Sequence, residues 1–267
     1  MTGAPNVTNP RRAGLAAVVL TAAALAAAAV APHSARAAQP AAAAPAAASA
    51  ADAITPAETL VFMSDQMHGV NPQTELDYSL ISTGEEKREP DTVRVLVMSP
   101  GNQKTDAQIS DRAGAAKLPN SGLPCNPVVI YFLEHDIADM QQLTGGQKRY
   151  FQQRVRLALA AGPKIASVRT QVGGKPVNAR QIVVQPYLND PNAERFPRYT
   201  GKRYTFVFAD DVPGHVVMIR TEVPGANGDF AHPVQTQTLA FESVMHKLPA
   251  KPGSPAAKPQ DGPRASR

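Results

Sequence analysis

Aromatic residues define the part of this chain that can form a hydrophobic core. All six Tyr and eight Phe residues lie between Phe62 and Phe241, and the chain has no Trp. Aromatic side chains bury large apolar areas, so a segment without them has little to offset the entropy lost on folding. We therefore predict a single β-rich domain over residues 57–246, which is long enough to bury a core without metals or disulfides.

The N-terminal end has the pattern of a secretory signal peptide. Arg11 and Arg12 precede an uncharged run of 19 residues, 13–31, and residues 35–37 (ARA) fit the small-x-small cleavage rule. Cleavage after Ala37 would give a periplasmic or secreted protein with no integral membrane span. The alternative is an uncleaved inner-membrane anchor, because the run is just long enough to cross a bilayer.

Two further segments are low in sequence complexity. Residues 38–56 form an Ala/Pro-rich linker, and residues 247–267 form a Pro/Lys tail that we expect to be disordered. Of the net charge of +5, the signal peptide carries +3 and the residues from 248 onward carry +3, which leaves −1 for residues 38–247. A nucleic-acid-binding domain needs a basic stripe, so we predict no nucleic-acid partner.

Alternating apolar and polar residues predict short strands in two blocks. The first block has strands at 58–62, 74–81, 92–99 and, more weakly, 106–110. The second block has strands at 165–172, 177–187, 203–209, 215–223 and 235–244. Tight turns such as Gly173-Gly174-Lys175 connect neighbouring strands, which favours antiparallel pairing.

Two helices are predicted between these blocks. Asn126 is a good N-cap and Pro127 suits the first helical position, and Ile130, Leu133, Ile137 and Met140 then form one stripe. A second helix covers 147–161 and follows a Gly-Gly link, so the two form a helical hairpin. The predicted fold class is α+β: a mostly antiparallel β-sheet, either open or curved into a half-barrel, with the two-helix hairpin packed on one face.

The densest polar cluster of the first predicted helix contains His135 and Asp139. These two residues lie at i and i+4 on one helix face, a spacing that can chelate a metal ion. A structural zinc site needs four ligands, and no His or Cys pair elsewhere has a matching spacing, so no metal is predicted. A solvated, acidic helix face is the favoured interpretation.

A basic cluster is the second candidate ligand-binding site. Lys148, Arg149, Arg154 and Arg156 lie on the second predicted helix and could contact a phosphate, a carboxylate or an anionic lipid headgroup. The alternative is a solvated helix face whose basic residues pair with acidic residues of the neighbouring helix. If some of these basic side chains face a cavity, ligand binding is favoured over a solvated helix face.

The sequence assigns no catalytic residue and no cofactor. Cys125 is the only cysteine and directly precedes a predicted helix N-terminus, which could lower a thiol pKa. A lone cysteine in an exported protein is more often incidental or paired with another chain. The motifs G-x-S-x-G, H-E-x-x-H, G-x-x-x-x-G-K-S/T and C-x-x-C are all missing from the sequence.

Two stretches carry a resemblance to a known family. The helical region 126–159, with Glu134-His135-Asp136 and Tyr150-Phe151, is similar to a block in a family of uncharacterised exported bacterial proteins, as is the later region 186–221. Strands wrapped over a helix pair also resemble the half-barrel of periplasmic lipoprotein-carrier proteins. That resemblance is architectural and implies no site residue.

These observations leave three hypotheses for function. The first is a non-catalytic domain that binds a hydrophobic ligand, a lipid moiety or an envelope partner in the concavity between sheet and helices. The second is an enzyme whose site contains His135 and Asp139 or the cluster Arg149, Arg154 and Arg156, which would require these side chains to converge on one pocket. The third is an envelope scaffold or interaction module that contacts anionic polymers through its tail.

Overall fold

The computed structural model describes residues 53–84, 87–100, 105–118 and 124–246. The predicted signal peptide, most of the linker and the C-terminal tail lie outside these residues and stay predictions. No helix of the described residues is both long enough and apolar enough to span a membrane.

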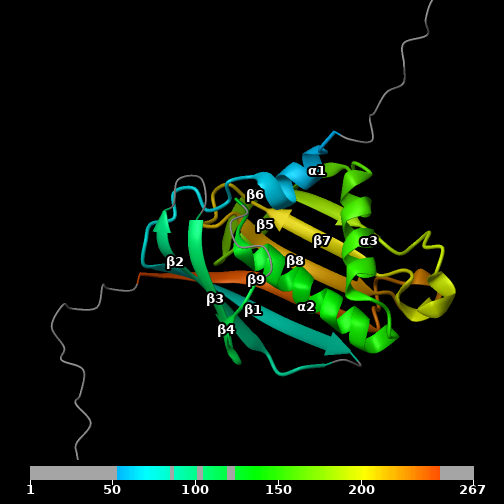
Figure 1. The fold of residues 1–267 in the computed structure, drawn as a ribbon. Coiled ribbons are helices and arrows are strands. Elements are labelled where there is room, and N and C mark those ends of the chain that lie inside the picture. The colour runs from blue at the N-terminus through cyan, green and yellow to red at the C-terminus, as the bar shows by residue number, and fades with distance from the viewer. Residues whose placement is uncertain (1–52, 85–86, 101–104, 119–123, 247–267) are drawn as a thin grey trace, which may run out of the picture. The chain divides into compact units, whose positions relative to one another are not determined.

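The described strands form one nine-stranded antiparallel sheet that is not closed (Figure 1), in the order β4-β3-β2-β1-β9-β8-β7-β6-β5. The strands are β1 (Thr74–Gly84), β2 (Asp91–Pro100), β3 (Thr105–Asp111), β4 (Gly114–Ala116), β5 (Ile165–Val172), β6 (Lys175–Val184), β7 (Arg203–Phe208), β8 (Val216–Val223) and β9 (Gln235–His246). The first and last strands pair along their length, from Thr74 opposite His246 to Gly84 opposite Gln235. This pairing merges the two predicted blocks into one sheet.

The helices lie on one face of the sheet (Figure 1). They are α1 (Pro56–Glu58), the π-helix η1 (Thr59–Met63), α2 (Pro127–Thr144) and α3 (Lys148–Ala160), and three 3₁₀ turns, η2 (Ala193–Arg195), η3 (Pro197–Tyr199) and η4 (Ala226–Gly228), lie in the connections. Helices α2 and α3 pack together as the predicted hairpin. The predicted α+β fold class, an antiparallel sheet with a helix pair on one face, is therefore confirmed.

Most of the predicted elements are confirmed with small shifts at their ends. The strand predicted over 58–62 is wrong, because this segment is helical in α1 and η1. Thr55 and Glu58 form a capping box, in which each side chain accepts a hydrogen bond from the other residue's backbone N–H. Pro56 at the first helical position favours the same start, and these two signals outweigh the β-propensity of the residues that follow.

Helix α2 begins and ends as predicted, but it is buried more widely than one stripe. The Asn126 side chain accepts a hydrogen bond from the Val128 N–H, and Gly145 ends the helix in the left-handed conformation, with φ 69°. Both the predicted stripe and a second set, which includes Phe132 and Asp136, are buried. Such a helix contacts neighbours on several sides.

The space between sheet and helices is filled with side chains. The aromatic residues with less than 2% of their surface exposed are Tyr78, Tyr187, Tyr204, Phe132, Phe151, Phe206 and Phe208. The alternation predicted for β7 places Tyr204, Phe206 and Phe208 in this core. Among the described residues, aromatic side chains of the sheet and of α2 and α3 therefore pack in the concavity in which we expected a ligand.

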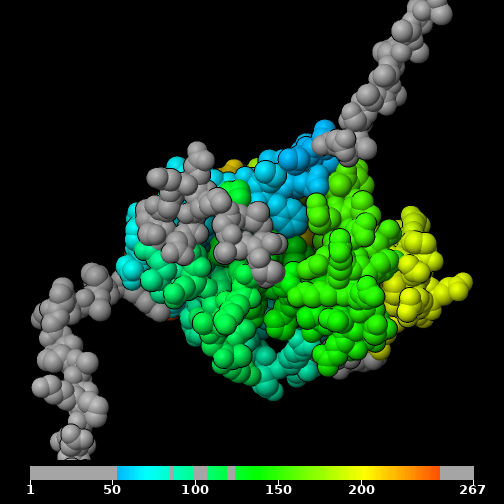
Figure 2. Space-filling model, viewed as in Figure 1, coloured from blue at the N-terminus to red at the C-terminus, as the bar shows by residue number. Residues whose placement is uncertain are grey.

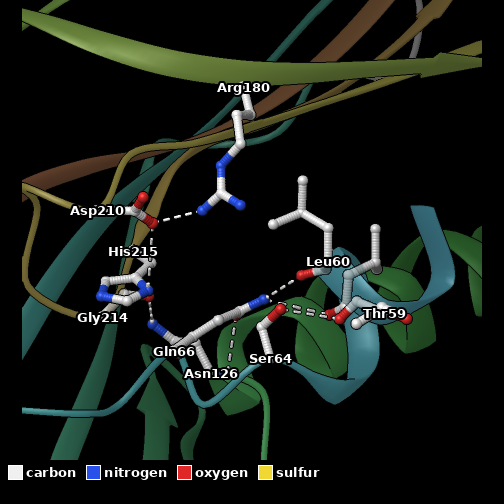
Figure 3. A network of polar contacts seen from close by, with 10 residues as sticks. Thr59, Leu60, Ser64, Gln66, Asn126, Arg180, Asp210, Gly214 and His215 are labelled. Atoms are coloured by element: carbon white, nitrogen blue, oxygen red, sulfur yellow. Dashed lines mark hydrogen bonds and ion pairs between the residues drawn. The ribbon is translucent and has the colours of Figure 1, made fainter. Parts of the chain in front are cut away.

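A buried polar network connects four parts of the fold (Figure 3). The side-chain amide of Asn126 donates to the Tyr78 hydroxyl at 2.8 Å and to the Gly214 carbonyl at 2.9 Å, while its backbone N–H donates to Gln66 Oε1 at 2.9 Å. Gln66 Nε2 donates in turn to the Leu60 carbonyl at 2.7 Å. These bonds fix the start of α2 against η1, β1 and the turn between β7 and β8.

The network predicts that Gly214→Ala will be strongly destabilising. A Cβ at Gly214 would lie 2.6 Å from both Asn126 Nδ2 and Leu76 Cδ1, and its φ of +76° is unfavourable for alanine. We expect the free energy of unfolding in urea to fall by about 3 kcal/mol, from backbone strain and overpacking together.

Gly69→Ala is the matched control. Gly69 has nearly the same φ, +78°, but a Cβ there has no atom within 4 Å. The free energy of unfolding of this variant should fall by about 1 kcal/mol, from backbone strain alone. Equal losses in the two variants would contradict the role assigned to the network.

Candidate functional site

The inner face of α2 carries a buried ion pair that attaches the helix to the sheet. Asp136 is 1% exposed, and its carboxylate accepts hydrogen bonds from Lys202 Nζ at 2.5 Å and from the Tyr204 hydroxyl at 2.6 Å. The favoured interpretation of a solvated acidic face is wrong for Asp136. Together with Phe132 and Met140 it forms an i, i+4, i+8 stripe that points at the sheet.

A second buried carboxylate holds α3 in place. Asp190 accepts a hydrogen bond from the Tyr150 hydroxyl, and its Oδ2 lies 2.8 Å from Nε of Arg154. The Asp190 side chain has no exposed surface, so Arg154 provides the charge that compensates it. Arg154, one of the predicted ligand-binding residues, is therefore engaged within the fold.

His135 and Asp139 lie on a third side of α2. Asp139 accepts a hydrogen bond from Arg88 Nη2 at 2.7 Å, and the His135 ring packs 5.6 Å from the ring of Tyr131. The Tyr131 hydroxyl donates to Asp111 of β3 at 2.7 Å, which locates this side of the helix beside the first strands. Within the described ranges, no group of three or more His, Cys, Asp or Glu residues is placed to hold a metal ion.

Arg149 and Arg156, in contrast, line a groove on the outer side of the helix pair. The groove has a volume of about 520 Å³. Helix α2 contributes Ile130, Leu133, Glu134 and Ile137, helix α3 contributes Arg149, Gln152, Gln153, Val155 and Arg156, and η1 contributes Phe62. Figure 2 shows this face of the molecule, with α3 in bright green beside the blue of α1 and η1.

The spacing along both helices explains why a groove forms there. The α2 residues 130, 133, 134 and 137 follow an i, i+3, i+4, i+7 pattern, and so do 149, 152, 153 and 156 of α3. Residues at this spacing share one helix face, so each helix turns one continuous face toward the groove. The α2 face is mostly aliphatic, whereas the α3 face is polar, which gives the groove an apolar floor and a polar rim.

The rim contains donors that have no acceptor. Among the described residues, Glu134 is the only acidic one in the lining, and it already pairs with Lys148 Nζ at 2.5 Å and accepts a hydrogen bond from Gln152 Nε2 at 2.8 Å. No ion pair or side-chain hydrogen bond joins Arg149, Gln153 or Arg156 to any residue that the structure describes. Exposed arginines beside apolar side chains have the chemistry to contact an anionic amphiphile.

The environment of Cys125 does not favour reactivity. The residue is 3% exposed, and burial raises the pKa of its thiol to about 12. The thiolate is the reactive form, so this cysteine is protonated near neutral pH. A disulfide with another chain would require this region to open first.

Sequence reasoning found part of this arrangement. It selected Arg149 and Arg156, but it did not separate them from Arg154, and it missed Phe62 because that segment was expected to be a strand. It also missed Lys202, which directly precedes β7 and carries no local signal of burial. The spacing of 132, 136 and 140 would have indicated that Asp136 faces the core.

Comparisons with known proteins bear on the architecture. No protein-family model matches the chain, and no curated protein matches it in sequence. Among solved structures, it is similar to the lipoprotein LppX of Mycobacterium tuberculosis, with 10% sequence identity, a TM-score of 0.31, and coverage of 69% of this chain and 91% of that chain. This match brings no site residue to this chain.

The different surroundings of the arginines on α3 give a stability prediction. Arg154→Ala would leave the buried Asp190 carboxylate without its cation, so we expect a loss of about 2–3 kcal/mol in the free energy of unfolding. Arg156→Ala, on the same helix, should change it by less than about 0.5 kcal/mol. Urea denaturation of the two variants tests this, and a similar loss in both would show that the assigned pairing is incorrect.

Proposed function

We propose that this chain is an exported, non-catalytic protein that binds an amphiphilic molecule in the groove between α2 and α3. The observation that carries the proposal is the combination of an aliphatic floor with two arginines that have no acidic partner among the described residues. The hydrophobic part of the ligand would lie along the floor, and its acidic group would meet the rim.

The groove has the properties of a small-molecule site. Its volume falls within the range of about 300–1,000 Å³ that is typical of ligand pockets, and its lining combines apolar side chains with polar ones that lie mainly on α3. Each methylene group transferred from water to an apolar floor contributes about 0.8 kcal/mol. An alkyl chain that lies over Ile130, Leu133 and Ile137 therefore contributes favourably to the free energy of binding, in proportion to the methylene groups that it buries.

The arrangement of the predicted site residues favours binding over catalysis. The enzyme hypothesis required His135, Asp139 and the arginines to converge on one pocket. Only Arg149 and Arg156 line this groove, whereas Arg154 pairs with Asp190 and Asp139 pairs with Arg88. Export rests on the leader, whose Arg pair, apolar run and cleavage motif fit a secretory signal.

Filling the groove should weaken ligand binding. Gln153 lines it and is exposed, so Gln153→Trp would place a large ring over the floor with little effect on folding. Binding is measured from the fluorescence of a dansyl-labelled fatty acid during a titration. The wild-type chain should show saturable binding. The variant should bind at least about tenfold more weakly, because it loses more than 1.4 kcal/mol of chain contacts.

Gln142→Trp provides the matched control. Gln142 is an exposed glutamine of α2 that does not line the groove. This variant should bind the probe as the wild-type chain does. Failure of the wild-type chain to bind, or equal binding by both variants, would contradict the proposal.

A further inference from the structure

Three donor side chains form a row along the rim of the groove. Arg149, Gln153 and Arg156 lie at i, i+4 and i+7 of α3, on one face of the helix, and all three are exposed. The rise of an α-helix places the two arginines about 10.5 Å apart along the axis, with Gln153 between them. Each long arginine side chain has to cover only about half of that distance to meet the other at one ligand group.

The charges along this row do not balance within the described part of the chain. The one acid that the described residues contribute to the lining, Glu134, is neutralised by Lys148, which lies on α3 just before the row. The other arginine of α3, Arg154, is neutralised by Asp190. Arg149 and Arg156 therefore leave two positive charges at the rim, and a ligand that carries two negative charges would complement them best.

The number of acceptors separates the candidate head groups. A carboxylate has one charge and two oxygens in a plane, so one guanidinium satisfies it in a bidentate pair and the second arginine stays unmatched. A phosphate monoester carries a charge of about −1.5 to −2 near neutral pH and three terminal oxygens. It can accept from both guanidinium groups and from the Gln153 amide at the same time.

We infer that the ligand of this groove is a single-chain lipid with a phosphate monoester head group, held between Arg149 and Arg156. This inference rests on the function proposed above and adds the head group to it. The aliphatic floor favours a lipid phosphate over free inorganic phosphate, since phosphate alone would leave the groove-facing surface of Ile130, Leu133 and Ile137 in contact with water.

Displacement of the dansyl fatty acid by lipids of equal chain length tests the head group. The competitors are lysophosphatidic acid, the unlabelled fatty acid, the neutral monoacylglycerol, and inorganic phosphate alone. Lysophosphatidic acid should displace the probe at a concentration at least about tenfold lower than the fatty acid, because it gains one further charge-assisted contact. Inorganic phosphate alone should displace little.

Two groove variants and one control complete the experiment. Arg149→Met and Arg156→Met keep most of the apolar stem and should each remove most of the advantage of the phosphate over the carboxylate. Arg169→Met changes an exposed arginine of β5 that lies outside this groove and should leave every affinity unchanged. Unchanged urea unfolding curves confirm that the variants are folded.

The outcomes separate this inference from the function on which it rests. Equal displacement by lysophosphatidic acid and fatty acid, with both binding, would overturn the phosphate assignment and leave the lipid groove intact. Displacement by inorganic phosphate as effective as that by lysophosphatidic acid would overturn the lipid source of the phosphate. No binding of any single-chain lipid would overturn the proposed function and the inference together.

Discussion

The buried ion pair between Asp136 and Lys202 determines how the helix pair sits on the sheet. Both groups have lost almost all contact with water, which costs several kcal/mol for each ion unless hydrogen bonds and the opposite charge compensate it. The Asp136 carboxylate also accepts a hydrogen bond from the Tyr204 hydroxyl. Asp136 reaches both partners in only one rotation of α2 about its axis, so the two contacts fix that rotation. Removal of either partner alone would cost about 3–5 kcal/mol.

That rotation has a direct consequence for the groove. With Asp136 turned toward the sheet, the face that contains Ile130, Leu133 and Ile137 turns toward α3. Helix α3 is fixed in a comparable way by Arg154 and Asp190, and by Phe151, whose ring packs 5.7 Å from that of Tyr187. A residue advances about 100° around a helix, so fixing Arg154 inward directs Arg156 outward.

Local patterns in the sequence predicted the elements but not the contacts between distant segments. Period-two alternation located the strands, and the Asn126 cap with the Gly-Gly link located the helical hairpin. The pairing of β1 with β9 joins segments about 160 residues apart, and no local pattern encodes it. The π-helix was missed because Val61 and Phe62 favour strands in isolation, whereas Pro56 and the capping box act through the preceding turn.

The candidate site shows the same division. Composition and spacing identified the basic cluster on α3, but the partners that distinguish its members come from elsewhere in the chain. Asp190 lies in the connection after β6, and Phe62 lies in a helix that precedes every strand. Which arginines are free to meet a ligand is therefore a property of the tertiary fold.

An amphiphilic ligand in the groove between α2 and α3 would contact Ile130, Leu133 and Ile137 and leave the packing within the sheet undisturbed. Methyl NMR spectra of the chain titrated with lysophosphatidic acid test this most directly. We expect chemical-shift changes at the methyl groups of Ile130, Leu133, Ile137 and Val155, with those of Val93, Ile219 and Leu239 unchanged. Changes centred on Val93, Ile219 and Leu239, or no changes at all, would contradict binding in the groove.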